Sequence, residues 1–307
     1  MDGKTLVSTL QGLLNEDDSS NFLDLKISYE WLWKGACEFV SRTNSMRTTQ
    51  VISTIANQSN YDISTDFLKI YLMDTSNNFI LSYTPIGQSA SFIFWQDYDE
   101  IIWRNSTTAA ARPTWWNVID SDTVYSPLSS TATATGNASG GQCTLTDSTA
   151  PFANVSAGDR VYNTTDGSQG IVLSKTSNSQ IVTALFNGNN DFWTSGDAYT
   201  LTFQGRARLV LSPPPQFTGD SIMLYYIQRP APVFSLYGTY RFQPQFVEAI
   251  VYFSAWAYKY RDREMNTADR LYKYFELEVQ RATSLNKSSI NKRDNRISFK
   301  KRSGRTL

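Results

Sequence analysis

The residue types that most enzymes use for catalysis are largely missing from this chain. It has 307 residues and no histidine, which excludes Ser-His-Asp and Cys-His catalysis and the HExxH type of zinc site. Neither G-x-G-x-x-G nor G-x-x-x-x-G-K-[ST] occurs, so a nucleotide-binding fold has no support. The two cysteines, Cys37 and Cys143, lie far apart and predict neither a disulfide framework nor a metal site. We therefore expect a protein that is not an enzyme and holds no cofactor or metal.

Two groups of acidic residues are the remaining candidates for chemistry. They are Asp97, Asp99 and Glu100, and Asp120 and Asp122. Paired carboxylates can serve glycoside hydrolysis or calcium binding. Acids spaced this closely in loops are more often solvated or capping groups, and that is the favoured interpretation.

The region after residue 142 has its own candidates. Asp147, Asp159 and Asp166 stand beside Gly, Ser or Thr, as acids in turns do. Aromatic side chains there could stack on a sugar or a base, although core packing is the more common role. These aromatic residues are Phe186, Phe192 and Trp193.

Charge is distributed unevenly along the chain. From Lys287 onward there are eight Lys or Arg residues and one acid, Asp294, a net charge of +7. The whole chain is neutral, so residues 1–286 carry −7. A basic tail on an acidic body suggests docking on an acidic partner or on nucleic acid. A solvated, disordered tail is an alternative of about equal weight.

Helical periodicity occurs at both ends of the sequence. Residues 3–14 and about 22–42 carry apolar side chains at helical spacing. Trp31 and Trp33 fall off the second stripe and could mark a second, exposed packing surface, although a place in the core is an alternative of about equal weight. Residues 244–285 are apolar on several sides, which favours burial, and a second helix should begin near Asn266.

Between these ends the period changes to two, which is typical of strands. Arg208–Leu211 and Ser221–Ile227 flank a Pro- and Gly-containing turn and predict a hairpin. Other predicted strands, all with period-two or apolar character, are 50–56, 66–72, 78–83, 92–95 and 112–119.

A shift in composition marks a further unit. Residues 129–142 are rich in Ser, Thr, Gly and Ala, and short β runs with few charges follow to Phe203. We interpret residues 129–205 as a small sandwich or barrel inserted into a hairpin that would otherwise pair Val118–Tyr125 with Ala207–Leu211.

The predicted fold class is therefore α+β: a helical bundle from the N- and C-terminal helices plus a β domain, with an inserted small all-β module. The predicted ranges are 1–44 for the N-terminal helices, 45–128 and 206–235 for the β domain, 129–205 for the inserted β module, 236–286 for the C-terminal helices and 287–307 for a basic extended tail. The start of the chain has no signal-peptide pattern, and no apolar run is long enough to span a bilayer. These patterns predict a soluble protein made in a cytoplasm.

The order of several motifs resembles the head–tail adaptor (connector) proteins of tailed bacteriophages. The resemblance covers residues 1–128 and 206–286 and departs from the family at Ser64-Thr65, where a proline would stand, and in the insertion. The motifs that carry it are Tyr61-Asp62-Ile63, Arg112-Pro113-Thr114-Trp115-Trp116, Leu209–Pro215, Ser221–Pro230 and the helical block 244–285.

The resemblance implies a structural virion protein in the neck between capsid and tail, assembled in the host cytoplasm. It implies a homo-oligomeric ring, commonly of twelve copies, whose helices surround the channel through which genome DNA passes non-specifically. Its partners would be the portal protein and a tail, nozzle or stopper protein, with no membrane involved. The tail would dock on the portal through basic side chains, namely Lys292, Arg293, Arg296, Lys300, Lys301 and Arg302.

Two other functions stay open. The first is a carbohydrate- or receptor-binding virion protein that acts through residues 129–205. The second is nucleic-acid binding by the basic tail, although Phe299 is its only aromatic residue and interleaved stacking is absent.

Overall fold

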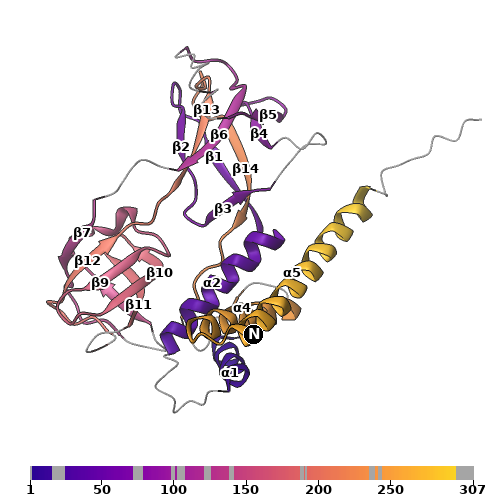
Figure 1. Ribbon diagram of the computed structural model, residues 1–307. Helices are drawn as coiled ribbons and strands as arrows, with labels where there is room; N and C mark the ends of the chain where they lie inside the picture. Colours follow the sequence, from indigo (N-terminus) through magenta and orange to yellow (C-terminus); the bar gives the residue numbers. More distant parts are fainter. Residues whose placement is uncertain are drawn as a thin grey trace, which may run out of the picture.

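The computed structural model describes residues 2–15, 25–71, 79–97, 101, 108–120, 126–137, 142–186, 190, 192–234, 239–240 and 244–294. Four helices lie together at one end of the molecule, with one β-sheet above them and another beside them (Figure 1). The helices are α1 (Gly3–Leu14), α2 (Leu25–Thr43), α4 (Val247–Arg261) and α5 (Met265–Asp294).

The helices join through their apolar stripes. Asp2 caps α1 by accepting a hydrogen bond from the backbone N–H of Thr5 at 2.9 Å, and Asn15 ends the helix in the left-handed conformation. The predicted stripe of α2 is buried from Tyr29 onward, where its side chains are described, and α4 is buried on several sides, as its sequence indicates. The core residues of α2 are Tyr29, Leu32, Ala36 and Phe39.

Above the helices stands a curled sheet of eight strands. Its order is β1-β14-β4-β5-β6-β13-β2, with β3 paired to β14, and among the strand pairs of the described residues only β5–β6 is parallel. The strands are β1 (Arg47–Ser53), β2 (Asn60–Asp62), β3 (Phe67–Ile70), β4 (Ile80–Thr84), β5 (Ser91–Trp95), β6 (Trp115–Asp120), β13 (Ala207–Ser212) and β14 (Ser221–Gln228).

The side chain of Gln50 brings the two ends of this sheet together. From β1 it donates to the carbonyl of Asp62 at the end of β2 and accepts from the N–H of Ser64 at 2.8 Å. The inward face, with Tyr83, Trp116 and Leu224 at its centre, forms a core of its own. The curl therefore encloses apolar side chains that a flat sheet would expose.

The second sheet has six strands in the order β7-β12-β9-β10-β11-β8. An antiparallel bridge from Ala134 to Thr146 joins the chain after β7 to β8, so the sheet is nearly closed into a barrel. Phe152, Trp193 and Tyr199 fill its interior and are fully buried. The strands are β7 (Leu128–Thr131), β8 (Cys143–Thr146), β9 (Arg160–Asn163), β10 (Gln169–Ser177), β11 (Gln180–Phe186) and β12 (Ala198–Thr202).

The predicted fold class is wrong in its balance of helix and strand. The described residues form fourteen strands in two curled sheets with four α-helices beside them, so the protein is mostly β rather than a helical bundle with a β domain and a small β module. The underestimate has a physical cause. β2, β7 and β8 have only 3 or 4 residues each, too few for an alternating pattern to stand out.

The predicted hairpin of β13 and β14 is also wrong. Three strands separate them in the sheet, because the prolines between them do not form a tight turn. The N–H of Ala110 donates to the carbonyl of Pro214 at 2.9 Å, and Pro215 forms an isolated parallel bridge with Ala110, so this proline segment runs beside residue 110 instead of turning back.

The predicted pairing of the two strands that flank residues 129–205 is confirmed. β6 and β13 are antiparallel neighbours, with Val118 opposite Leu209. The chain thus leaves the eight-stranded sheet after β6, builds the six-stranded sheet, and returns beside the strand from which it left.

The two tryptophans of α2 do not form an exposed surface. Trp33 is buried and donates its indole N–H to the carbonyl of Pro230 at 2.9 Å. Trp31 packs edge-on against Tyr258 and lies under the guanidinium of Arg261. Both hold α2 to the chain that leaves β14 and to α4.

Candidate interaction surfaces

The outer side of α5 carries a second apolar stripe, distinct from the buried one. Its inner stripe, which includes Phe275 and Val279, packs on α2 and α4. Tyr274, Leu277 and Leu285 lie beside this stripe at helical spacing and are between 44% and 51% exposed, although the ring of Tyr274 also contacts Tyr252 of α4. Since an apolar stripe on a soluble helix normally faces a partner, this side of α5 is a candidate interface.

A groove of about 670 Å³ runs along the same side of α5. Phe246, which precedes α4, lies in its wall with Leu277 and Leu285. Its charged rim consists of Glu278 and Arg281, which pair with each other on the helix. The groove thus combines apolar and uncharged polar side chains with one balanced pair of charges, which suits a helix or loop of another protein chain.

An ion pair holds α5 to α2 next to this groove. The guanidinium of Arg42 contacts both carboxylate oxygens of Glu276, with a distance of 2.8 Å from Nη2 to Oε2. The hydrogen bonds from Arg42 hold the pKa of Glu276 below its usual value. A bidentate pair fixes the rotation of a helix better than a single contact, so α5 keeps its second stripe turned outward.

The predicted docking residues fall into two groups. Lys292 and Arg293 belong to α5, which continues to Asp294. Residues 287–294 are therefore helical, where the sequence led us to expect an extended tail. Arg296, Lys300, Lys301 and Arg302 lie outside the described residues. In Figure 1 the last turns of α5 extend beyond the other helices.

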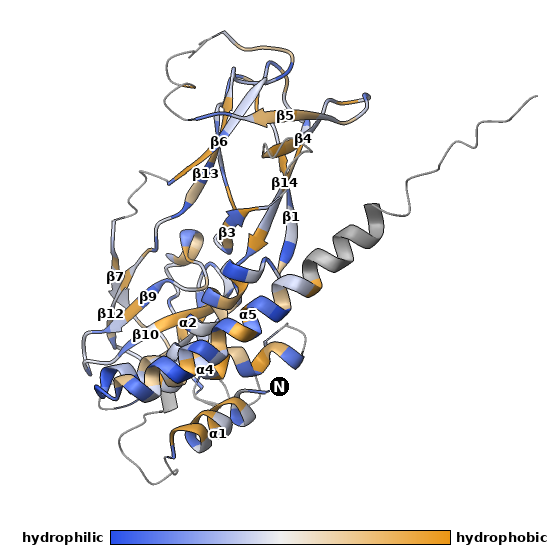
Figure 2. Cartoon of the chain, turned by 45° about the vertical axis from the view of Figure 1, so that its right-hand side comes forward, coloured by the Kyte–Doolittle hydropathy of each residue, from blue (hydrophilic) through white to orange (hydrophobic). Residues whose placement is uncertain are grey.

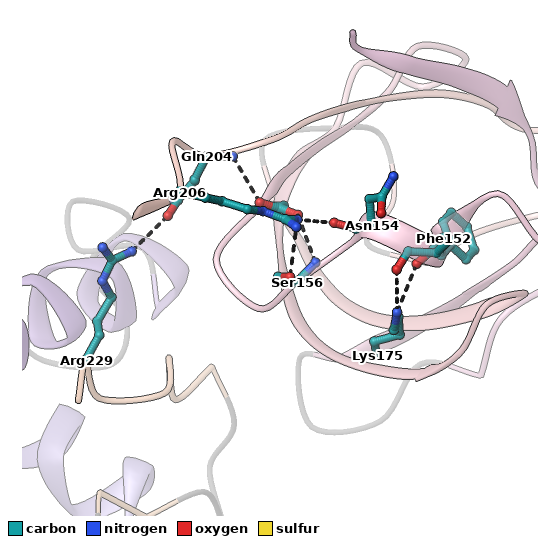
Figure 3. Close-up of polar contacts among 9 residues, drawn as sticks. Phe152, Asn154, Ser156, Lys175, Gln204, Arg206 and Arg229 are labelled. Carbon is teal, nitrogen blue, oxygen red and sulfur yellow. Dashed lines mark hydrogen bonds and ion pairs between the residues drawn. The ribbon is translucent and has the colours of Figure 1, made fainter. Parts of the chain in front are cut away.

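A chain of polar contacts joins the six-stranded sheet to the segments leading into and out of the eight-stranded sheet (Figure 3). Arg229, directly after β14, donates to the side-chain oxygen of Gln204 at 3.0 Å. The N–H of Gln204 donates to the buried carboxylate of Asp159 at 3.0 Å, and Asp159 also accepts from the N–H of Ser156. Arg206 completes the set by contacting Ser156 and the carbonyl of Asn154.

These contacts constrain how the two sheets are placed. Burial raises the pKa of Asp159, while the two backbone hydrogen bonds and Arg206 act in the opposite direction. Because Ser156 precedes β9 while Gln204 and Arg206 follow β12, the carboxylate of Asp159 fixes the return from β12 towards β13. We interpret the junction as a structural brace, since Arg229, Gln204, Asp159 and Ser156 bind one another in a continuous series.

A cleft of about 430 Å³ separates the six-stranded sheet from α2 and α4. Arg160 of β9 reaches across it to Glu30 of α2 at 3.1 Å, and Lys34 binds the same carboxylate at 3.1 Å. Burial raises the pKa of Glu30, but the two cations outweigh burial and lower it overall. This ion pair, rather than a ligand site, is what the cleft contains.

The three acids after residue 142, together with Phe192 and Trp193, have structural roles, whereas the side chain of Phe186 lies outside the described part of the structure. Asp147 and Asp166 accept from backbone N–H groups two residues further on, as predicted for turn acids. Trp193 is a core residue that donates to Thr183 at 2.9 Å. Among the described residues, no three metal-binding side chains come together. Asp99, Glu100 and Asp122 lie outside these residues.

The far end of the eight-stranded sheet carries exposed apolar side chains that the sequence analysis did not identify. Ile55, Ile86 and Phe217 are each more than half exposed, and they sit in three different loops at the same end of the sheet. The available signal was a large apolar residue directly before or near a turn glycine, in Ile86-Gly87 and Phe217-Thr218-Gly219. Only the fold brings the three loops together.

Comparison with known proteins yields no family assignment. No protein-family model matches the chain, and no curated protein sequence is significantly similar to it. No helix in the described part of the chain combines the length and the apolar character that crossing a membrane requires. The sequence and structure of the chain are therefore the basis for inferring its function.

Proposed function

We propose that the protein is the ring-forming subunit of a head–tail adaptor, a structural virion protein that joins the portal to the tail of a bacteriophage. The observation that carries the proposal is α5, a 30-residue helix with one apolar stripe in the core and another exposed. The motif order, which resembles that family, supplies the identity of the assembly. In this proposal the portal lies on one side, a tail, nozzle or stopper protein on the other, and DNA passes through without specific binding.

Exposed apolar surface on α5 favours contact with a second copy of the chain. A closed ring uses head-to-tail contacts, so each subunit needs two different complementary surfaces. The exposed stripe of α5 and its groove would be one of these surfaces. Tyr274, Leu277 and Leu285 would be buried by the neighbouring subunit, and burying large apolar side chains is the main source of affinity in such contacts.

The proposal is tested by the size of the assembly. Wild-type chain should form rings visible by negative-stain microscopy, alone or on purified portal, with a mass by light scattering that is a multiple of 34.7 kDa. Leu277→Ser combined with Leu285→Ser should shift the chain towards the monomer, with the circular dichroism spectrum unchanged.

A matched control removes a comparably exposed apolar side chain from another surface. Tyr260→Ser, at the end of α4, should leave the assembly intact. If the wild-type chain forms no ring and does not bind portal, the proposed function is wrong. If rings persist in the double serine variant, the adaptor function can stand but α5 is not its subunit interface.

A further inference from the structure

The loops at the far end of the eight-stranded sheet form a surface that we call the apolar tip. Three side chains define it: Ile55 between β1 and β2, Ile86 between β4 and β5, and Phe217 between β13 and β14. Ile86 is 69% exposed, and Ile55 and Phe217 are each 51% exposed. A pocket of about 560 Å³ opens beside Ile86 and Phe217.

Hydrogen bonds between the loops hold this tip in one shape. Thr54 and Ala56 bind Phe217 and Thr218: Thr54 Oγ1 donates to the carbonyl of Phe217 and the N–H of Ala56 donates to Thr218 Oγ1, both at 2.9 Å. The N–H of Gly219 donates to the carbonyl of Thr54 at 2.9 Å. The loops are therefore mutually fixed, although they are far apart in sequence.

The loop that carries Ile86 is a tight turn attached to the same framework. The N–H of Gln88 donates to the carbonyl of Pro85 at 3.1 Å, and Gly87 has φ +72°, as a type II turn requires at that position. The N–H of Ile86 donates to the carboxylate of Asp220 at 2.9 Å. The exposed apolar side chains thus stand on a rigid base, and a partner would pay little ordering entropy to bind them.

The described loops around the apolar tip carry few charges. Within the described loops at this end of the sheet, residues 54–59, 85–90, 108–114 and 213–220 contain two charged residues, Arg112 and Asp220. Asp220 is buried and accepts hydrogen bonds from Tyr83 and Ile86. Arg112 is exposed in the wall of the pocket, donates to the carbonyl of Phe92, and forms no ion pair within the described residues.

Apolar surface continues from the tip onto β5. Phe92 and Phe94 point outward from this strand and are about half exposed, and β5 appears hydrophobic in Figure 2. The combination is an extended apolar surface with a positive charge at its side, that of Arg112, which has no ion-pair partner in the described part of the chain. Such a surface is complementary to an apolar segment that carries a carboxylate next to its apolar side chains.

We propose that the apolar tip is a docking site for another protein, which inserts an apolar side chain beside Ile86 and Phe217 and places a carboxylate on Arg112. This inference rests on the proposed function in one respect, because it takes the partner to be the tail-side component that follows the adaptor. The tip lies at the end of the molecule away from the helices (Figure 1), so α5 and the tip can contact different partners at once.

The test uses full-length chain assembled on purified portal, with the purified tail-side component as the probe. Ile86→Ser and Phe217→Ser should each weaken its binding about 30-fold, the size expected for a residue central to an interface. Arg112→Glu should abolish binding, whereas Arg112→Lys should retain it within about 10-fold. Val51→Thr, which changes an exposed apolar residue on β1 away from the loops, is the matched control and should bind as wild type does.

Each outcome decides between specific alternatives. Tail-side binding that is lost in the tip variants and kept in Val51→Thr supports the inference. Equal binding by all variants, with rings and portal binding intact, overturns the inference and leaves the proposed function standing. Absence of rings on portal for the wild-type chain overturns both.

Two further readouts exclude other occupants of the tip. Phosphatidylcholine vesicles that bind the wild-type chain but not Phe217→Ser would show a lipid partner and overturn the inference. A change in ring mass caused by Phe217→Ser would show that the tip contacts a second copy, which would overturn it as well. Melting temperatures near that of wild type establish that the variants are folded.

Discussion

Asp147 accepts hydrogen bonds with both of its carboxylate oxygens. It is fully buried in the six-stranded sheet. It accepts hydrogen bonds from Ser130 at 2.6 Å, from Tyr199 at 2.7 Å, and from both the N–H and the hydroxyl of Thr149. Burial raises the pKa of Asp147, but these hydrogen bonds together outweigh burial and lower it. The carboxylate therefore links three segments of the barrel, and its hydrogen bonds favour the ionised form.

We predict that Asp147→Asn destabilises the protein by about 1–3 kcal/mol at pH 7, because an amide nitrogen cannot accept from the hydroxyl donors. A lowered folded-state pKa means that the stabilisation is present above the unfolded value of 3.8 and is lost as pH falls through the folded value. Urea unfolding of wild type and variant at several pH values measures the difference, which should shrink in acid. The exposed Asp269→Asn of α5 is the control and should show no such difference.

At the level of elements, the close approach of β10 and β11 depends on one glycine. A Cβ added to Gly170 would lie 2.2 Å from the carbonyl oxygen of Ala184 on β11, a distance that no substitution tolerates without backbone movement. The neighbouring residues Ile171 and Ala184 belong to the core that the helices share with this sheet. The same glycine thus affects both the barrel and its contact with the helices.

We predict that Gly170→Ala costs about 1–3 kcal/mol or more through this clash. Gly12→Ala is the matched control, because Gly12 lies in α1 with no atom within 4 Å of an added Cβ, and it should stabilise the protein by about 0.5–1 kcal/mol. Thermal unfolding of both variants measures the two effects. A Gly170→Ala variant as stable as wild type would contradict this close approach of β10 and β11.

The whole molecule combines a neutral overall charge with a strongly basic end. In the proposed adaptor, the residues after α5 reach the portal through Arg296, Lys300, Lys301 and Arg302. Because α5 continues to Asp294, a deletion that tests portal binding by the tail should begin after this residue. Deletion from Lys287 would remove helical turns together with the basic residues beyond them, whereas deletion after Asp294 leaves the helix complete.

We predict that deletion of residues 295–307 leaves the fold and the ring intact but weakens portal binding, and that wild-type binding falls as salt is raised because exposed charges are screened. Co-sedimentation with portal at low and high ionic strength measures this. A control chain that keeps the length of the tail but replaces Lys300, Lys301 and Arg302 with Gln separates charge from length. Portal binding that is equal in all three chains at low salt would rule out docking by the tail.

Local sequence patterns determined several parts of this protein. The repeat of apolar residues placed α1, α2 and α4, since a helix stripe depends only on residues a few positions apart. The absence of histidine from the sequence was enough to exclude catalysis and zinc binding that depend on this residue. The change of composition after residue 128 correctly predicted where the chain leaves the eight-stranded sheet. The predicted pairing of the flanking strands, β6 and β13, was also correct.

Only the tertiary structure decided what depends on contacts between distant segments. The separation of β13 from β14, the curling of both sheets and the burial of Trp33 follow from long-range pairing that no local period encodes. The same reason applies to the candidate surfaces. Ile55, Ile86 and Phe217 are ordinary loop residues in sequence, and they become one surface because hydrogen bonds between three loops bring them to the same end of a curled sheet.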